Sequence, residues 1–337
     1  MGLPGRLLIG LGAQGSNDPI SAIMSENLKV DIYERYLGGG DWTAWNAAPC
    51  DYVCVVANAA DSIGAVPMFT QYQMANNGDG NLAVLNDASF MTTYWNRARL
   101  LFQDIAAYKK PALVNLEPDF WGYAERAAAG GDPTKLAALV TLDPDCAALP
   151  NDVTGVAGCL MLTARKYAPN AFIGFPPSTW GGNTDADVIA FMNAVGAQHA
   201  DFIVEQTLDR DAGCFEAAPA YCVRAGAFYW DESNQTHPNF ADHLASVTSY
   251  HLGIGGLPVI WWQTPEGVPA STPGGVDYRY RDDREHYFLT HAAELTAAGG
   301  LAVVFSTGES HQTNITTDGG QFQALSSAYL AAPAPLP

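Results

Sequence analysis

The chain has 337 residues, 48% of them hydrophobic, which is enough for a sizeable core in one large α/β barrel or two average domains. Its formal net charge is −19, from 16 basic and 35 acidic residues. Because this negative field repels nucleic acid and anionic lipid surfaces, we expect neither as a partner. No apolar run approaches the roughly 20 residues of a transmembrane helix.

Eight short apolar segments recur along the chain, and their β-branched and aromatic residues predict strands that are covered on both faces. They span residues 6–12, 30–36, 65–72, 112–117, 171–175, 202–206, 259–263 and 301–306. Apolar residues at helical spacing predict helices over 94–108, 185–195, 240–250 and 287–298. We also expect a helix to begin at Asp18-Pro19 and another to end at Gly299-Gly300.

Strands that alternate with helices, with no visible break, predict a single (β/α)8 TIM barrel over residues 1–330. Residues 124–159 form the longest stretch that does not follow the alternation of strands and helices, and they predict an enlarged loop region after strand 4. Residues 331–337 are rich in Pro and Ala, which indicates the stub of a linker and is compatible with a further module beyond it.

The alternative fold is a doubly wound open sheet. Gly10, Gly12 and Gly15 match the GxGxxG pattern of dinucleotide-binding loops, and Asp31 follows at about the expected distance. In that fold the third glycine opens the helix directly, whereas here three residues precede the helix start at Pro19. We therefore favour a packing role for these glycines at the barrel mouth.

The six cysteines form close pairs in regions predicted as loops or short helices: Cys50 and Cys54, Cys146 and Cys159, Cys214 and Cys222. They lack the paired CxxC spacing of zinc sites, so we expect no metal. We predict three local disulfides and a secreted or periplasmic protein, with scattered buried thiols as the alternative. The first residues lack the basic and apolar regions of a signal peptide, so a secreted form would have lost its leader.

The strand predicted at 112–117 ends in Glu117, Pro118 and Asp119, followed by Trp121 and Tyr123. A central strand should stop at Pro118, because proline has no backbone donor and a fixed φ. Parallel α/β proteins carry their active sites at this end of the sheet. The two acids are therefore candidate catalytic groups, although a helix cap and a solvated loop acid would also fit.

The carboxyl ends of all eight strands meet at one mouth in a barrel, and here they carry acids, amides and aromatic rings. Indole and phenol faces stack on sugar rings, while amides and guanidinium groups bind hydroxyls. The candidate catalytic carboxylates are Glu117, Glu205, Asp119 and Glu34. The candidate substrate-binding side chains are Arg35, Tyr36, Trp42, Gln71, Trp121, Tyr123, Trp180, Gln206, Trp262, Gln263, Glu266 and His311. Of the adjacent Trp261 and Trp262, one should face the barrel and the other a helix.

Two carboxyl groups among aromatic rings predict glycoside hydrolysis, in which one acid protonates the leaving oxygen and a second carboxylate acts as nucleophile or base. The sequence resembles TIM-barrel glycoside hydrolases. In their largest clan an Asn-Glu-Pro triplet ends the fourth strand and carries the acid/base, and Asn115-Leu116-Glu117-Pro118 is similar to it. That clan also has a nucleophilic glutamate on the seventh strand, where Gln263 stands here.

Because Gln263 is uncharged, we choose Glu205 as the partner of Glu117, with a structural ion pair to Arg35 or Arg210 as the alternative role for Glu205. The predicted function is a secreted glycoside hydrolase that cleaves a polysaccharide or oligosaccharide without a cofactor. A non-catalytic glycan-binding barrel is the second hypothesis, favoured by the missing seventh-strand glutamate. The third is an NAD(P)-dependent oxidoreductase that uses the glycine loop at residues 10–15.

Overall fold

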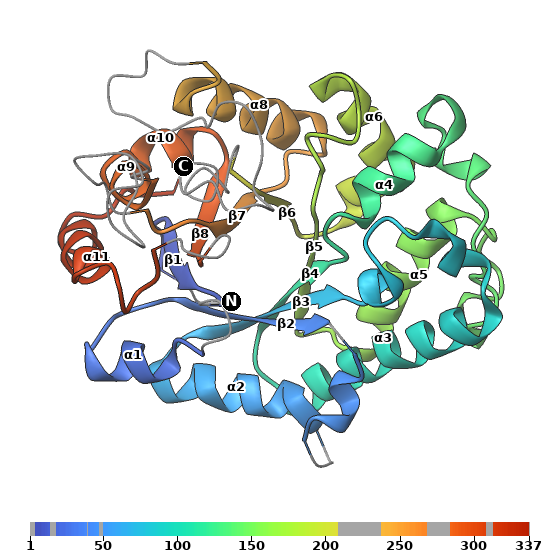
Figure 1. Cartoon of the computed structure of the whole chain (residues 1–337), viewed down its shortest axis with the longest axis horizontal. Helices are drawn as coiled ribbons and strands as arrows, with labels where there is room; N and C mark the ends of the chain where they lie inside the picture. The colour runs from blue at the N-terminus through green and yellow to red at the C-terminus, as the bar shows by residue number, and fades with distance from the viewer. Residues whose placement is uncertain are drawn as a thin grey trace, which may run out of the picture.

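The computed structural model describes residues 4–13, 18–38, 40–46, 50–207, 237–267, 284–307 and 313–336. Eight parallel strands close into a barrel in chain order, and β8 pairs with β1 (Figure 1). They are β1 (Leu8–Leu11), β2 (Ile32–Gly38), β3 (Val66–Tyr72), β4 (Ala112–Leu116), β5 (Ala171–Phe175), β6 (Phe202–Glu205), β7 (Val259–Thr264) and β8 (Gly300–Phe305). The predicted TIM barrel is confirmed, and the open sheet is excluded.

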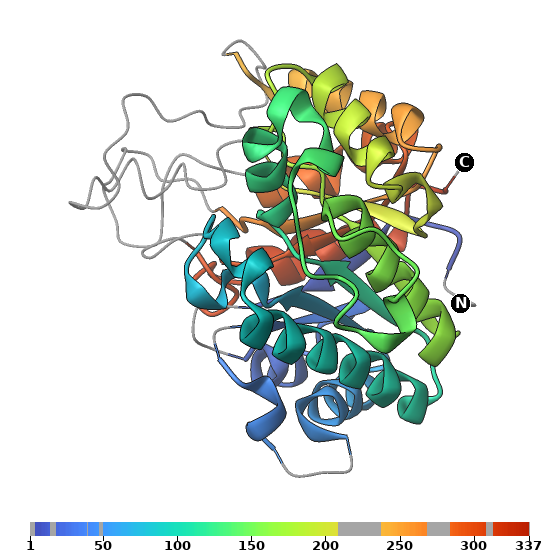
Figure 2. The same ribbon diagram turned by 90° about the vertical axis from the view of Figure 1, so that its right-hand side faces the viewer.

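Helices surround the barrel, and Figure 2 shows α3 (teal) and α5 (green) in front of the strands. The α-helices are α1 (Ile20–Ser25), α2 (Asp51–Ile63), α3 (Ala88–Tyr108), α4 (Phe120–Ala127), α5 (Val153–Tyr167), α6 (Asp185–Ala194), α8 (Phe240–Gly253), α9 (Arg284–Thr290), α10 (Ala292–Ala297) and α11 (Gln321–Ala331). Short 3-10 turns are η1 (Trp42–Ala44), η2 (Met74–Asn77), η3 (Leu82–Asn86), η4 (Ala129–Gly131), η5 (Pro133–Lys135), η6 (Pro144–Cys146) and η7 (Ala197–His199). The four helices predicted from periodicity correspond to α3, α6, α8 and the pair α9–α10.

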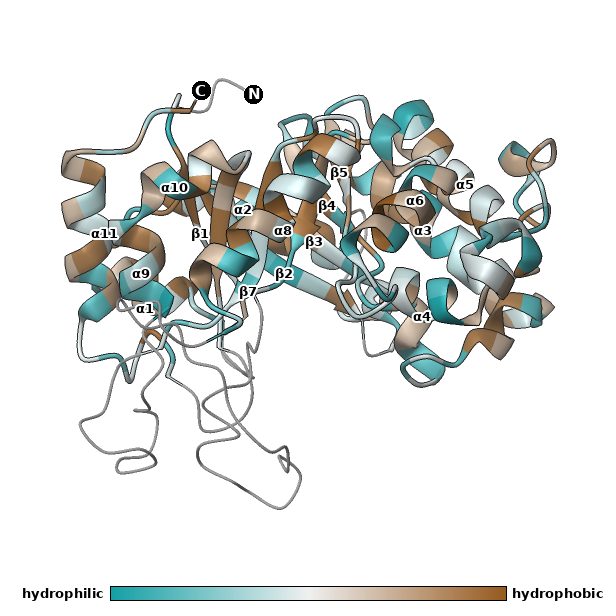
Figure 3. Ribbon diagram, turned by 90° about the horizontal axis from the view of Figure 1, so that it is seen from above, coloured by the Kyte–Doolittle hydropathy of each residue, from teal (hydrophilic) through white to brown (hydrophobic). Residues whose placement is uncertain are grey.

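Strand side chains alternate between two cores, as a period of two requires. One core fills the bore of the barrel and consists of Leu8, Ile32, Met68, Leu113, Phe202, Val204, Ile260, Trp262, Ala302 and Val304. The other lies beneath the helices and includes Trp261, so the predicted divergence of the two adjacent tryptophans is confirmed. In Figure 3 many strand segments are brown, whereas the helices alternate between brown and teal.

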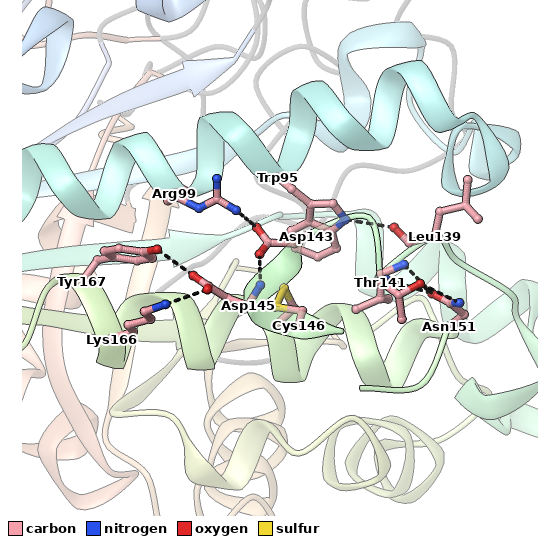
Figure 4. The surroundings of a disulfide bond; sticks show 12 residues. Trp95, Arg99, Leu139, Thr141, Asp143, Asp145, Cys146, Asn151, Lys166 and Tyr167 are labelled. Carbon is pink, nitrogen blue, oxygen red and sulfur yellow. Dashed lines mark hydrogen bonds and ion pairs between the residues drawn. A yellow bond between two sulfur atoms is a disulfide. The ribbon is translucent and has the colours of Figure 1, made fainter. Parts of the chain in front are cut away.

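The enlarged region after β4 runs through α4, η4, η5 and η6 to α5, as predicted. A disulfide between Cys146 and Cys159 joins η6 to α5, with 5.5 Å between the Cα atoms. Beside it, Arg99 of α3 donates a 2.6 Å hydrogen bond to the Asp143 carboxylate (Figure 4). The region is therefore fastened to two helices rather than left as an open loop.

A second predicted disulfide, Cys50–Cys54, spans the start of α2 with 5.2 Å between the Cα atoms. The third predicted pair, Cys214 and Cys222, lies outside the described residues. Among the helices that the structure describes, none is both long enough and apolar enough to cross a bilayer.

The Pro/Ala-rich end of the chain lies against its beginning (Figure 3). The Leu7 amide donates to the Ala334 carbonyl at 3.2 Å, and the Leu336 amide donates to the Gly5 carbonyl at 3.1 Å. Residues 334–336 are thus paired with the segment that precedes β1. That residues 331–337 belong to a linker stays a prediction.

Candidate active site

An aromatic cluster forms the floor of the barrel mouth. The Tyr36 ring lies 5.5 Å from the Trp262 ring at a tilt of 45°, and 6.2 Å from the Tyr72 ring, which it meets edge-on. Trp262 is only 2% exposed, whereas both tyrosines are partly exposed. These residues come from β7, β2 and β3, so three strands build one surface on which a sugar ring could rest.

Two amide side chains extend this floor. Gln263 Nε2 donates a short hydrogen bond to the Tyr36 hydroxyl, and Gln206 Nε2 donates to Gln263 Oε1 at 2.7 Å. Gln263 has φ 52°, and the register between β7 and β8 shifts beside it. This irregularity turns its side chain into the mouth, although the preceding residue, Trp262, already faces the bore.

Asp119 stands at the rim, directly after Pro118 and with φ 64°. The Tyr72 hydroxyl donates to Asp119 Oδ2 at 2.9 Å, and it lies 2.6 Å from Oδ1 of the exposed Asp79. The single phenolic hydrogen is shared between the two carboxylates. Asp119 is partly exposed, so its carboxylate is accessible to a ligand in the mouth.

Glu34 lies below the aromatic floor, inside the bore, and is 1% exposed. Thr70 Oγ1 donates to its Oε1 at 2.6 Å, and Trp262 Nε1 approaches the same oxygen at 3.4 Å. Burial raises the pKa of Glu34, and the bonds from Thr70 and Trp262 partly oppose that rise. A Cβ at Gly12 would come within 2.5 Å of Glu34 Oε2, so this glycine has a packing explanation.

Glu117 faces the helices rather than the mouth. It is 0% exposed, with φ 54°, and its Oε2 accepts from the amides of Gln73 at 3.0 Å and Met74 at 2.9 Å. Burial raises the pKa of Glu117 to about 8, against the opposing effect of these amides and of Tyr94 on α3. The residue thus anchors the connection from β3 to η2, a role that sequence reasoning did not foresee.

Glu205 is also fully buried, and it lies on the same face of β6 as Ile203, which packs beneath the helices. Neither carboxylate oxygen has a hydrogen-bond partner within the described part of the chain. Burial raises the pKa of Glu205 well above its ordinary value, and the nearby Asp185 adds to the rise. Arg35, one predicted partner, instead donates to the Tyr52 hydroxyl at 3.2 Å, and Arg210 is outside the described residues.

A narrow pocket with a volume of about 20 Å³ opens at the mouth between β4, β5, β6 and β7. It is lined by Pro118, Asp119, Pro176, Pro177, Ser178, Thr179, Trp180, Val204, Glu205, Gln206 and Trp262. Tyr123 lies beside it, because its ring meets the Trp180 ring edge-on at 4.7 Å. The structure therefore brings together five predicted site residues as lining: Asp119, Trp180, Glu205, Gln206 and Trp262.

Other predicted substrate-binding residues lie elsewhere. Trp42 and Trp121 are 1% and 0% exposed in the core beneath the helices, and Trp121 Nε1 donates to the Leu116 carbonyl at 2.8 Å. Gln71 is buried beside the Glu117 carboxyl group. Each of these side chains supports the barrel from outside and offers no exposed surface to a sugar.

Arg35 also points away from the bore, because it alternates with Glu34 and Tyr36 along β2. Glu266 is 0% exposed. His311 lies outside the described residues, as do the glycine at position 15 and the strand-end residues 208–211.

Sequence reasoning did not include several polar residues of the bore and mouth among the site residues. They are Thr70, Tyr72, Asn115 and Ser178. Thr70 and Tyr72 follow Met68 at intervals of two on β3, so the alternation of side chains along that strand could have placed them on the bore side. Asn115 follows Leu113 in the same way on β4, and neither its amide nitrogen nor its oxygen has a hydrogen-bond partner within the described ranges.

No family model matches the chain, and no curated protein matches it in sequence. Endoglucanase Cel5A from the hyperthermophilic Thermotoga maritima is 11% identical and matches 95% of this chain and 96% of its own, with a TM-score of 0.53. The cellulose synthase subunit Z from Clostridioides difficile is 8% identical over 96% of this chain and 99% of its own, with a TM-score of 0.52. A D-psicose 3-epimerase from Clostridium cellulolyticum H10 is 12% identical over 97% and 96%, with a TM-score of 0.47. At these identities the likeness shows a TIM-barrel fold that glycoside hydrolases share.

Proposed function

We propose that this chain is a secreted glycoside hydrolase that cleaves a polysaccharide or an oligosaccharide at the mouth of its barrel. The observation that carries the proposal is the hydrogen bond from Tyr72 to Asp119, next to a floor of aromatic and amide groups. An acid beside stacking rings and hydroxyl-binding amides is the combination that sugar cleavage requires. The two disulfides are typical of an oxidising compartment and support secretion.

We assign Asp119 as the carboxyl group that meets the substrate, because it is the only one of the four predicted catalytic acids with more than 1% exposure. Glu34 is its partner in this proposal. Its raised pKa keeps it protonated at higher pH than an ordinary glutamate, which suits the acid of the pair. Asp119 then acts as the ionised carboxylate, as nucleophile or as base for water.

Glu205 is the alternative partner of Asp119, because both residues line the mouth cavity, although Glu205 is fully buried on the face of β6 that packs beneath the helices. Glu117 has a structural role in this proposal, because its carboxylate accepts hydrogen bonds from two backbone amides. Amide variants of the three glutamates separate these roles. Only the true partner should combine a large loss of kcat with a melting temperature that is not lowered.

The test is product release from neutral glucans, mannans, xylans and galactans by the wild type, Asp119→Asn and Asp79→Asn. Both aspartates contact the Tyr72 hydroxyl, but only Asp119 lines the mouth cavity, so Asp79→Asn is the matched control. We expect Asp119→Asn to lose on the order of 10²–10⁴-fold in kcat, the usual share of acid–base catalysis. The control should remain within about threefold of the wild type, as a surface carboxylate outside the reaction would.

One observation favours a second function, the binding of a glycan without cleavage. Gln263 stands where the resembling clan has its nucleophile, and it is engaged with Tyr36 and Gln206. A barrel of this kind would hold a sugar on its floor but lack the second carboxylate. A glycan that raises the melting temperature yet is never cleaved would favour this function over the first.

A further inference from the structure

A second cavity lies outside the mouth, between α4 and α6, which are neighbours in Figure 1. Its volume is about 570 Å³, and its lining includes Glu125, Arg126, Trp180, Asn183 and Asp187. Trp180 lines the mouth cavity too. A single indole therefore connects the two cavities.

Glycines let the loop after β5 lie directly on α4. A Cβ at Gly122 would come within 2.5 Å of Ser178 Cβ and 2.8 Å of the Trp180 ring. A Cβ at Gly181 or Gly182 would come within 2.5 or 2.6 Å of the Glu125 carboxylate oxygens. Side chains at these positions would push the loop away, so the glycines fix both the indole and the carboxylate at the cavity.

Glu125 is 6% exposed, and its carboxylate forms no hydrogen bond or ion pair within the part of the chain that the structure describes. Its carboxylate lines the cavity, so a ligand hydroxyl could donate a hydrogen bond to it there. Burial raises the pKa of Glu125 to about 7, and Asp187 beside it contributes. Two neighbouring acids disfavour an anionic ligand, and Arg126 in the same lining disfavours a cationic one, which favours a neutral ligand with hydroxyl groups.

The Trp180 ring is held on two sides. The Arg126 guanidinium lies 4.7 Å from its centroid, and the Tyr123 ring meets it edge-on at 4.7 Å. The indole is thereby fixed at the border of the two cavities, where Arg126 adds donors to the acceptor that Glu125 supplies. Asn183 adds an amide that can both donate and accept.

We propose that this outer cavity, bounded by Glu125, Arg126, Trp180 and Asn183, is a distal sugar-binding subsite for a neutral glycan chain. The inference rests on the proposed function, because the chain would reach it from the mouth by passing over Trp180. It implies that the substrate is a polymer or a long oligosaccharide that occupies both cavities. Short oligosaccharides fill the mouth alone and miss the contacts with Glu125 and Asn183.

The test is the ratio of kcat/KM for an octasaccharide to that for a trisaccharide of the same glycan, measured for the wild type, Glu125→Gln and Asn183→Ala. We expect the ratio to fall by up to about 10-fold in Glu125→Gln, because a hydrogen bond to a carboxylate is replaced by a weaker one to a neutral amide oxygen. Asn183→Ala should lower it by about threefold, as for one neutral hydrogen bond. Asp104→Asn is the matched control, because Asp104 is also a buried acid with a raised pKa but lies outside both cavities.

An unchanged ratio in both variants, with normal turnover, would overturn the subsite and leave the proposed hydrolase standing. A wild type that cleaves no glycan would instead refute the hydrolase. The subsite is then judged by the ratio of dissociation constants for the same two oligosaccharides, measured by calorimetry. If the wild type binds neither, both proposals fail.

Discussion

The Tyr72 hydroxyl donates a 2.9 Å hydrogen bond to Oδ2 of Asp119, which joins the end of β3 to the residue that follows β4 and Pro118. The contact holds the one exposed candidate acid against the aromatic floor of the mouth. Its strength depends on a single phenolic hydrogen, which Asp79 also approaches. Tyr72 is therefore a positioning residue for Asp119 in our account.

Removal of that hydroxyl tests the positioning role. In Tyr72→Phe we expect kcat to fall by about 10-fold with KM nearly unchanged, because a misplaced acid slows the chemical step but does not weaken substrate binding. The pH–rate profile should also change, since Asp119 loses a donor, whereas a merely structural role would leave the profile in place. A variant with wild-type kcat and pH profile would contradict the role.

Glu117→Gln should lower stability more than activity. The amide oxygen can still accept from Gln73 and Met74 in place of Oε2, but the amide nitrogen then replaces Oε1, which also accepts from the Gln73 amide at 3.2 Å. A buried donor left unpaired costs about 1–3 kcal/mol. We expect a melting temperature lower by several degrees and a kcat within about threefold of wild type at a temperature where the variant is folded. Glu294→Gln, on an exposed position of α10, is the control. A 100-fold loss of kcat at unchanged melting temperature would restore Glu117 as the catalytic acid.

Stability should fall as the pH rises from about 4.5 to 8. Burial raises the pKa of Glu34 and Glu205, that of Glu117 to about 8 and that of Glu125 to about 7. Between the unfolded and the folded pKa, each group binds more protons in the folded state, so the free energy of unfolding decreases with pH. Melting temperatures measured from pH 4 to 9 should therefore decline above pH 4.5, and a rise towards pH 8 would contradict the raised values.

Glu205→Gln should respond in the opposite sense to Glu117→Gln. The two Glu205 oxygens have no hydrogen-bond partner in the described segments, so the substitution by glutamine breaks no hydrogen bond. Because the pKa of Glu205 is raised in the folded state, its carboxyl group destabilises the wild type at high pH, and a neutral amide does not. We expect a melting temperature at pH 8 a few degrees above the wild type and a smaller difference at pH 5. Equal or lower stability at pH 8 would show that the carboxyl group has a partner.

Replacing Cys146 and Cys159 together by serine should destabilise the fold by about 2–4 kcal/mol, because the bond closes a loop and ties η6 to α5. The same change at Cys50 and Cys54 should cost less, since the loop that it closes is shorter. Non-reducing peptide mapping should recover both pairs. Free thiols at these four positions would contradict the disulfides and remove the main support for secretion.

The barrel itself could be predicted from sequence because continuous apolar strands and periodic helices are regular features. The orientation of the site residues could not be predicted, because side chains alternate between the bore and the helices only while a strand stays regular. Leu116 faces the helices, so a regular strand would have sent Glu117 into the bore, but its positive φ turned it outwards. A positive φ at Gln263 had the opposite effect and brought that amide into the mouth. Neither residue is glycine, so the sequence carried no signal of the turn.

In the proposed hydrolase, catalysis depends on Asp119 rather than on Glu117. The most direct measurement is kcat on the best substrate for Asp119→Asn, Asp79→Asn and Glu117→Gln, with the melting temperature of each. We expect a loss on the order of 10²–10⁴-fold for Asp119→Asn at an unchanged melting temperature, and rates near the wild type for the other two. Wild-type turnover by Asp119→Asn, together with an inactive but stably folded Glu117→Gln, would contradict it.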